Sequence, residues 1–337
     1  MIIIFEPLGR LGNRLLLSAY GTALAQASGQ PFLNFSLEEY RDLFPETRLP
    51  SWLPTWRFHK LVRATIVAFK RIPGTGRWFV RLDRQNATAH SPDNPEFVAA
   101  VKRRVLTIIE GWPDPARIGF SPQASIAIRH KFKPPPQVLR VARETVERAR
   151  RGSDLLVGLH IRLTDYREYR QGIFYYDLRD YRRAMAKMTA MLPERRVAFL
   201  VCSDQEQDAR SFGPFQVTIG LGTPLGDLHS LAECDYIIGP PSTYSLWAAF
   251  YGNKPLYHMI EPDPPKDLSA FMVPDGRFEC IDLMLGDREI ARRRKLRKTG
   301  IVPKRRAVRV DTPENALKPL VKLFGVAELK KALQSYD

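Results

Sequence analysis

Apolar residues in the second half of the chain gather into short runs, and longer segments with helical spacing separate them. The runs predict buried strands at residues 155–161, 197–202, 216–219, 236–238 and 255–258. Helical patterns fit between several of them, notably at 181–191 and 246–251. Short apolar strands that alternate with helices predict a parallel, doubly wound α/β sheet.

The first residues of the chain predict a strand, a loop, a helix and a second strand. Ile2-Ile3-Ile4-Phe5 indicates a buried strand, and a glycine-containing loop follows at 9–14. A helix is expected at 15–28, where Gly29 ends it, before a strand at 31–35.

Residues 41–133 mix aromatic, proline and basic residues and show less regular spacing. Within them, residues 56–72 predict a basic amphipathic helix. Its apolar face either packs in the protein core or lies on a membrane, and core packing is the preferred interpretation.

Three consecutive prolines at 134–136 form the clearest break in the chain, and a helix is expected at 138–151. A chain of 337 residues has two domains by default. The expected parts are an N-terminal domain (1–136), a second domain (137–310) and C-terminal helices (311–337) that start near Thr312.

The net charge is +16, from 52 Lys and Arg against 36 Asp and Glu. Eleven basic residues and one acidic residue lie within 288–309, so much of this charge sits in one tract. The tract is either a solvated segment or a region attracted to an anionic membrane surface. Nucleic acid is an unlikely partner because no aromatic residues interleave for base stacking.

Cysteine usage and motif searches exclude several classes of protein. The three cysteines form no CxxC pair, so neither a disulfide framework nor a zinc site is expected. No HExxH, DxD or GxSxG motif occurs, which disfavours a metal enzyme and a serine hydrolase. The sequence shows neither a signal-peptide pattern nor an apolar run of membrane-spanning length. We expect a cytoplasmic protein, and peripheral association with a membrane stays open.

Polar residues follow the predicted strands where parallel sheets bind ligands, at the strands' carboxyl ends. These positions are His160 to Asp165, Ser203-Asp204, Ser242 to Ser245, and the loop from Gly9 to Asn13. We therefore expect all four to contribute to one ligand site.

Each of these residues also has a purely structural interpretation. Ser242, Thr243 and Ser245 either cap a helix or bind phosphate, and three hydroxyl groups near an arginine favour phosphate. Arg162 either forks onto a diphosphate or pairs with Asp165. His160 faces the same side of its strand as Arg162 and has a structural alternative. Asp204 either accepts hydrogen bonds from guanine or caps a helix that begins at Gln205.

Four motifs, taken in order, resemble those of bacterial α-1,2-fucosyltransferases. Gly9-Arg10-Leu11-Gly12-Asn13-Arg14 is similar to G-G-L-G-N-Q, and His160 to Tyr166 is similar to H-x-R-R-x-D-Y. Ser203-Asp204 resembles S-D-D, and Ser242 to Ala249 resembles S-T-F-S-W-W-A-A. The wider superfamily includes α-1,6- and protein O-fucosyltransferases.

The resemblance implies two Rossmann-like domains facing across a cleft, the glycosyltransferase B-type fold. It implies inverting transfer of fucose from GDP-fucose to a hydroxyl of a glycan or glycoconjugate, as in polysaccharide biosynthesis, with no metal or cofactor. Residues 1–136 would be the acceptor side and 137–310 the GDP-binding domain.

The resemblance also implies a role for each matching residue. His160 and Asp204 would bind guanine, and Arg162 would be the catalytic residue that holds the β-phosphate of the leaving GDP. Ser242, Thr243 and Ser245 would line the phosphates or ribose. Asn13, Arg10 and Gly12 would reach the diphosphate from the N-terminal side.

The departures of the chain from the family pattern include Leu163 for the second Arg, Gln205 for the second Asp, Arg14 for Gln and Leu246 for Trp. Two alternatives therefore stay open: a glycosyltransferase that uses another nucleotide sugar, and a non-catalytic basic protein that binds nucleic acid or membranes through 288–309. Glu6 lies beside the glycine loop and is either a general base or a structural residue, and Asp165 is interpreted as a brace for Arg162.

Overall fold

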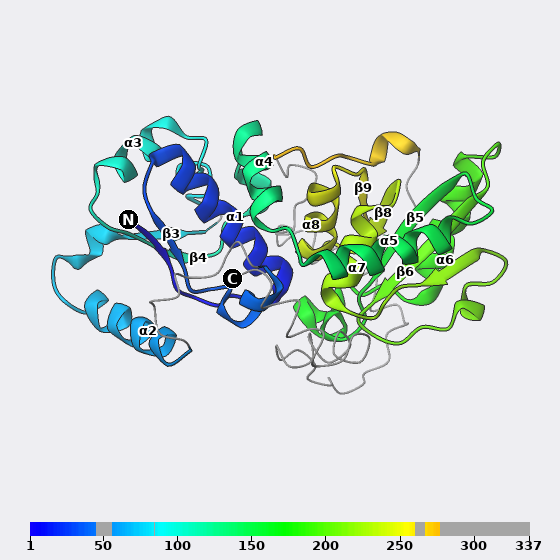
Figure 1. The fold of residues 1–337 in the computed structure, drawn as a ribbon, viewed down its shortest axis with the longest axis horizontal. Coiled ribbons are helices and arrows are strands. Elements are labelled where there is room, and N and C mark those ends of the chain that lie inside the picture. The colour runs from blue at the N-terminus through cyan, green and yellow to red at the C-terminus, as the bar shows by residue number, and fades with distance from the viewer. Residues whose placement is uncertain (45–55, 84, 260–266, 277–337) are drawn as a thin grey trace. The chain divides into compact units, whose positions relative to one another are not determined.

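The computed structural model describes residues 1–44, 56–83, 85–259 and 267–276. These residues form two compact units (Figure 1). Unit 1 contains Met1–Pro135 with Asp275 and Gly276, and unit 2 contains Pro136–Pro274. The basic tract 288–309 and the helices expected in 311–337 lie outside the described residues.

Unit 1 is built on a four-stranded parallel sheet with the order β2-β1-β4-β3. Its strands are β1 (Ile2–Ile4), β2 (Phe32–Asn34), β3 (Phe79–Leu82) and β4 (Thr107–Gly111). The first two strands confirm the sequence prediction. The other two lie in the segment without regular spacing, where the pattern did not reveal them.

Helices cover both faces of this sheet, as buried parallel strands require. On one face, Ile4 and Phe32 pack against Gly21 of α1 (Leu11–Ser28), which also contacts α3 (Pro95–Arg103) and α4 (Pro122–Lys131). On the other face, Ile66 of α2 (Trp56–Lys70) joins a core cluster with Phe5 and Ile108. This packing confirms the core interpretation of the amphipathic helix.

The first helix begins four residues earlier than the sequence predicted, at Leu11. Gly9 turns the chain with a φ of 68°, and Arg10 is the N-cap residue. Gly12 and Asn13 therefore lie in the first helical turn, and the glycine loop is shorter than expected. The end at Gly29, which has a left-handed conformation, confirms the prediction.

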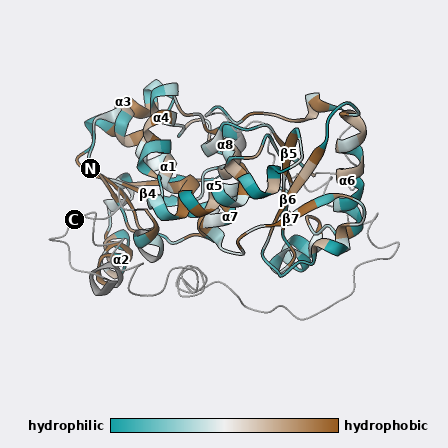
Figure 2. Cartoon of the chain, turned by 45° about the vertical axis from the view of Figure 1, so that its right-hand side comes forward, coloured by the Kyte–Doolittle hydropathy of each residue, from teal (hydrophilic) through white to brown (hydrophobic). Residues whose placement is uncertain are grey.

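Unit 2 contains a five-stranded parallel sheet with the order β7-β6-β5-β8-β9. The strands are β5 (Leu155–Ile161), β6 (Val197–Ser203), β7 (Gln216–Ile219), β8 (Tyr236–Gly239) and β9 (Leu256–His258). All five agree with the predicted strands within one residue at each end. Figure 2 shows the apolar character of β5, β6 and β7.

The helices of unit 2 are α5 (Pro136–Arg150), α6 (Leu178–Met191), α7 (Pro224–Ala232) and α8 (Thr243–Gly252). The helix predicted at 138–151 begins at Pro136, because proline is tolerated in a helix's first turn. α7 is absent from the predicted helices, although Thr223 and Pro224 are a typical helix start and the Thr223 side chain accepts from Gly226 N–H.

The connections of unit 2 create a switch point at the centre of the sheet. The chain runs outward from β5 to β6 and β7, and then crosses through α7 to β8 on the other side of β5. In open α/β sheets, ligands bind outside the carboxyl ends of the strands at such a point. We therefore expect a ligand site at the loops that follow β5 and β8. No helix in the described part of the chain is long and apolar enough to cross a membrane.

Candidate functional site

Arg162 directly follows β5 and is the most strongly constrained charged residue at the switch point. Its Nε and Nη2 atoms donate to the two carboxylate oxygens of Asp165, at 2.9 and 2.8 Å. The guanidinium group lies over the Tyr166 ring, 4.7 Å from its centroid, and the side chain is only 14% exposed. The third guanidinium nitrogen, Nη1, takes no part in the pair with Asp165. The proposed brace is thus present, and the planar cation is held in one orientation.

The pKa of Arg162 is raised although burial acts to lower it, because Tyr166 and Asp165 stabilise the cation. A permanent positive charge therefore lies at the carboxyl end of β5. Such a charge suits the binding of an anion at this position.

Tyr166 links the two loops that flank the switch point. Its hydroxyl group donates to the carbonyl oxygen of Pro241, at 2.7 Å, and its side chain is buried. The sequence analysis included Tyr166 in a motif but assigned it no role. The link joins residues 75 positions apart, and no local pattern reveals such a contact.

His160 is buried within β5, and its ring lies against Tyr244 with a centroid separation of 4.8 Å. Gly239 permits this packing, because a Cβ atom there would lie 3.0 Å from the His160 Cβ. Burial and then the charge of Arg162 lower the pKa of His160 well below its ordinary value, so the imidazole is neutral. Within the described residues its Nδ1 atom has no hydrogen-bond partner. The site thus contains a neutral ring with one nitrogen unused.

Asp204 follows β6 and organises the loop after β5. Its Oδ1 accepts from Leu163 N–H at 2.8 Å, and its Oδ2 accepts from the backbone N–H and the hydroxyl of Thr164. The alternative role as a helix cap is wrong, because the next helical turn begins at Ala209 and Asp208 caps it. The carboxylate remains exposed to solvent, and a role in guanine binding stays a prediction.

The three hydroxyl residues near β8 have different environments. Ser242 is the N-cap of α8 and accepts from Tyr244 N–H at 3.2 Å, as the capping interpretation proposed. Ser245 is fully buried, and its hydroxyl lies 3.2 Å from both the Ser242 carbonyl oxygen and His258 Nε2. Thr243 is partly exposed at the first position of the helix. Of the three, only Thr243 is therefore partly exposed, and ligand contact by any of them stays a prediction.

The glycine loop of unit 1 is packed around the Asn13 side chain. A Cβ atom at Gly9 would lie 2.1 Å from Asn13 Nδ2, so the loop needs glycine there. Arg10 and Asn13 are partly exposed, whereas Gly12 is buried. Arg14, at the position of the family's Gln, donates from Nε to the Gly9 carbonyl at 3.0 Å and lies over the Tyr40 ring. This substitution therefore stabilises the loop from within.

Glu6 has a structural partner in unit 1. Its Oε2 accepts from Gly111 N–H at 3.2 Å, where β4 ends in a left-handed turn. A Cβ atom at Gly111 would lie 2.3 Å from the Leu82 carbonyl oxygen, so this turn also requires glycine. The contact favours the structural interpretation of Glu6 over a catalytic base.

Asp227 on α7 of unit 2 is buried and is absent from the residues predicted from the sequence. Its Oδ1 accepts from Leu221 N–H at 2.6 Å, in the loop between β7 and α7. Burial raises its pKa to about 7, although the backbone hydrogen bonds oppose the shift. A correct helix assignment to 224–232 would have placed it near the loop, but nothing in the sequence marks its burial.

Replacing Asp227 with Asn is expected to flatten the pH dependence of stability. The unfolded carboxyl releases its proton near pH 3.9, whereas the folded one holds it to about pH 7. The unfolded state therefore binds fewer protons between these values, and the stabilisation is lost as the pH rises through about 7. Urea unfolding from about pH 4 to pH 7.5 checks this.

The exposed Glu194→Gln variant is the matched control, because it also replaces a carboxylate with an amide. We expect the control to keep the pH profile of the unmodified protein. Parallel profiles for the Asp227→Asn variant and the unmodified protein would contradict the prediction.

No group of three or more His, Cys, Asp or Glu residues is placed to hold a metal ion in the part of the chain that the structure describes. The two described cysteines, Cys202 and Cys234, are buried and free.

Comparisons with known proteins place this fold among those of sugar-transferring enzymes. No family model and no curated protein matches the chain. Solved structures do match, and they include a fucosyltransferase, NodZ from Bradyrhizobium, at 16% identity over 78% of this chain and 96% of that chain, with a TM-score of 0.50. A variant of FUT1 from Arabidopsis thaliana, solved in complex with GDP, matches at 14% identity over 80% and 73%, with a TM-score of 0.51. Identities this low show a common α/β fold.

Proposed function

We propose that the protein is an inverting, metal-independent glycosyltransferase that transfers fucose from GDP-fucose to a hydroxyl group of a glycan or glycoconjugate. Unit 2 would bind the donor and unit 1 the acceptor, as the two Rossmann-like domains of a B-type glycosyltransferase. The main supporting observation is Arg162, a cation that is only 14% exposed and is held by Asp165 and Tyr166 at the switch point of the unit 2 sheet.

The reaction requires stabilisation of the departing diphosphate. The bond between the sugar's anomeric carbon and the β-phosphate oxygen breaks as the acceptor oxygen attacks from the opposite face, and the proton of the acceptor hydroxyl passes to water. Negative charge then develops on GDP, and Arg162 would meet it with its Nη1 atom. The positive end of the α8 dipole and the hydroxyl of Thr243 would contribute at the same place.

Recognition of the base would use the neutral ring of His160 and the exposed carboxylate of Asp204. A carboxylate accepts hydrogen bonds from the ring N–H and amino groups of guanine, which adenine does not present together. A similar structure supports this proposal, because the FUT1 variant was solved in complex with GDP.

Calorimetric titration of the full chain with GDP, UDP and ADP in EDTA tests the donor proposal. We expect GDP to bind at least tenfold more tightly than UDP or ADP, a difference of about 1.4 kcal/mol. EDTA should leave this affinity unchanged, and release of GDP from GDP-fucose should continue in its presence.

Other results would point to other functions. Preference for UDP or ADP would indicate a different nucleotide sugar. Absence of nucleotide binding, together with binding to anionic polymers, would instead support a non-catalytic basic protein.

A further inference from the structure

The outer face of α2 is unusually apolar for a helix that already buries its other side. Val62, Ile66 and Phe69 pack on the unit 1 sheet. On the helix and the turn after it, Leu61, Val67 and Ile72 are 61%, 43% and 55% exposed. A helix that packs on a core normally presents polar residues to solvent, so these three side chains need an explanation.

The exposed apolar residues lie on the side of the helix that faces away from the sheet. Helical spacing places the exposed Ala64 and Ala68 beside them. We call Leu61, Ala64, Val67, Ala68 and Ile72 the α2 outer face. Of the nine large apolar side chains that are this exposed in the described residues, three belong to it. Scattered exposure is normal, but such a concentration marks a contact surface.

The stretch of sequence that contains this surface is strongly basic. Residues 47–82 contain eight Lys or Arg and no Asp or Glu. Arg63 and Arg71 are exposed next to the outer face, and Lys70 pairs with Glu110 of the sheet. This charge lies apart in sequence from the tract at 288–309 and is a second basic region. Its complement is an anionic partner.

We propose that the α2 outer face binds an anionic lipid membrane. The helix would lie in the plane of the interface, with Leu61, Val67 and Ile72 entering the boundary of the acyl chains. Arg63 and Arg71 would contact the lipid headgroups. In Figure 1, α2 lies at the edge of unit 1, on the side of the sheet opposite to α1.

Lipid fits this surface better than nucleic acid. Nucleic-acid binding relies on cations at phosphates and on aromatic stacking, and it gives no role to three protruding aliphatic side chains. A membrane interface uses both the cations and the aliphatic groups. This inference does not depend on the donor chemistry proposed above.

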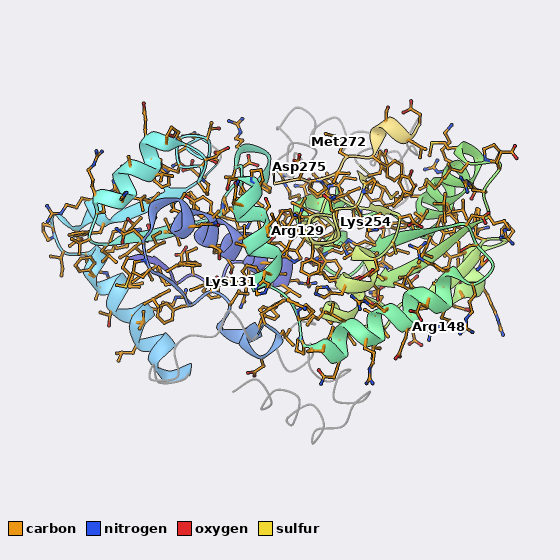
Figure 3. The ribbon with its side chains drawn as sticks, turned by 45° about the horizontal axis from the view of Figure 1, so that its top comes forward. Arg129, Lys131, Arg148, Lys254, Met272 and Asp275 are labelled. Atoms are coloured by element: carbon orange, nitrogen blue, oxygen red, sulfur yellow. The ribbon has the colours of Figure 1, made fainter. Side chains whose placement is uncertain are left out.

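An environment-sensitive fluorophore on Leu61→Cys tests the insertion directly, in the full chain with Cys280→Ser. Cys202 and Cys234 are buried and leave the introduced thiol as the target. The vesicles contain phosphatidylcholine with about one-third phosphatidylglycerol. We expect a blue shift and protection from aqueous iodide on these vesicles and neither effect on phosphatidylcholine alone. The same probe on Arg148→Cys, on the outer side of α5 in unit 2, should stay aqueous (Figure 3).

Two sets of variants separate the contribution of the apolar side chains to vesicle binding from the contribution of the charge. The triple variant Leu61→Ser, Val67→Ser and Ile72→Ser should lower vesicle partitioning by roughly tenfold, with an unchanged thermal midpoint. Arg63→Glu with Arg71→Glu should also lower it. The matched pair Arg148→Glu and Arg151→Glu changes the net charge equally at exposed positions of unit 2 and should have little effect.

Specific results would overturn the proposal. A probe at position 61 that stays aqueous while the protein sediments with vesicles would assign binding to another region. Binding to a DNA duplex without binding to vesicles would assign the surface to nucleic acid. The probe measurement decides the question even where the triple variant fails to fold.

Discussion

Arg162→Ala is expected to weaken GDP binding by tenfold or more, about 1.4 kcal/mol, and to reduce fucosyl transfer by about 10²- to 10³-fold. The larger effect on transfer follows from the reaction, because the charge on GDP grows as the glycosidic bond breaks. Titration calorimetry with GDP and initial rates with GDP-fucose measure the two effects. Arg162→Lys should recover only part of the loss, because one ammonium group lacks the planar fork that holds Asp165.

Arg179→Ala is a close control for this experiment. Arg179 also makes a two-pronged contact, from Nε and Nη2 to Asp177, but its side chain is 68% exposed. Exposed pairs of this kind contribute about 0–1 kcal/mol, so the control should bind GDP normally. Equal GDP affinities for folded Arg162→Ala and Arg179→Ala variants would exclude Arg162 from the donor site.

Trp247→Ala is expected to lower the stability of unit 2 by about 3–5 kcal/mol. Trp247 is fully buried in α8, and its ring lies 5.6 Å from that of Phe250. Its removal leaves a large cavity, and a loss of this size is a major part of the 5–15 kcal/mol that stabilises a typical domain. Hydrogen exchange followed by mass spectrometry should show faster exchange in peptides that cover β5 and β8.

Trp78→Ala provides the comparison in unit 1. Trp78 is only partly buried, and Arg77 lies over its ring at 5.1 Å. We expect a smaller loss of stability, and the faster hydrogen exchange should appear in peptides of β3 and not in those of β5. Unchanged protection of β5 and β8 in Trp247→Ala would show that α8 does not contribute to the core of unit 2 as the structure indicates.

The two central strands of unit 2, β5 and β6, could be predicted because each is buried along nearly its whole length and therefore consists of a nearly continuous apolar run. Val197 to Ser203 is an example, with five buried residues in succession. The apolar pattern did not reveal β3, because its exposed Arg81 interrupts the run. β3 is an edge strand that pairs only with β4.

For the candidate site as well, the sequence predicted some features and left others open. The sequence brought together the strand ends at His160, Arg162 and Ser242, since parallel strands carry their carboxyl ends to one edge. It left open whether Arg162 pairs with Asp165, and the structure contains that pair. It did not separate the partly exposed Thr243 from the buried Ser245, because a helix turns neighbouring residues in different directions.

The sequence by itself determined the α/β class, the five strands of unit 2 and the motif residues around its switch point, because local apolar spacing and strand order along the chain encode them. Only the tertiary structure decided that Tyr166 joins the Pro241 carbonyl, that Asp204 anchors the Leu163 loop and that Asp227 is buried. The first two contacts join residues that are far apart in the chain, and the burial of Asp227 depends on how α7 packs on the sheet. Their energies depend on packing and solvent exclusion, which no local pattern contains.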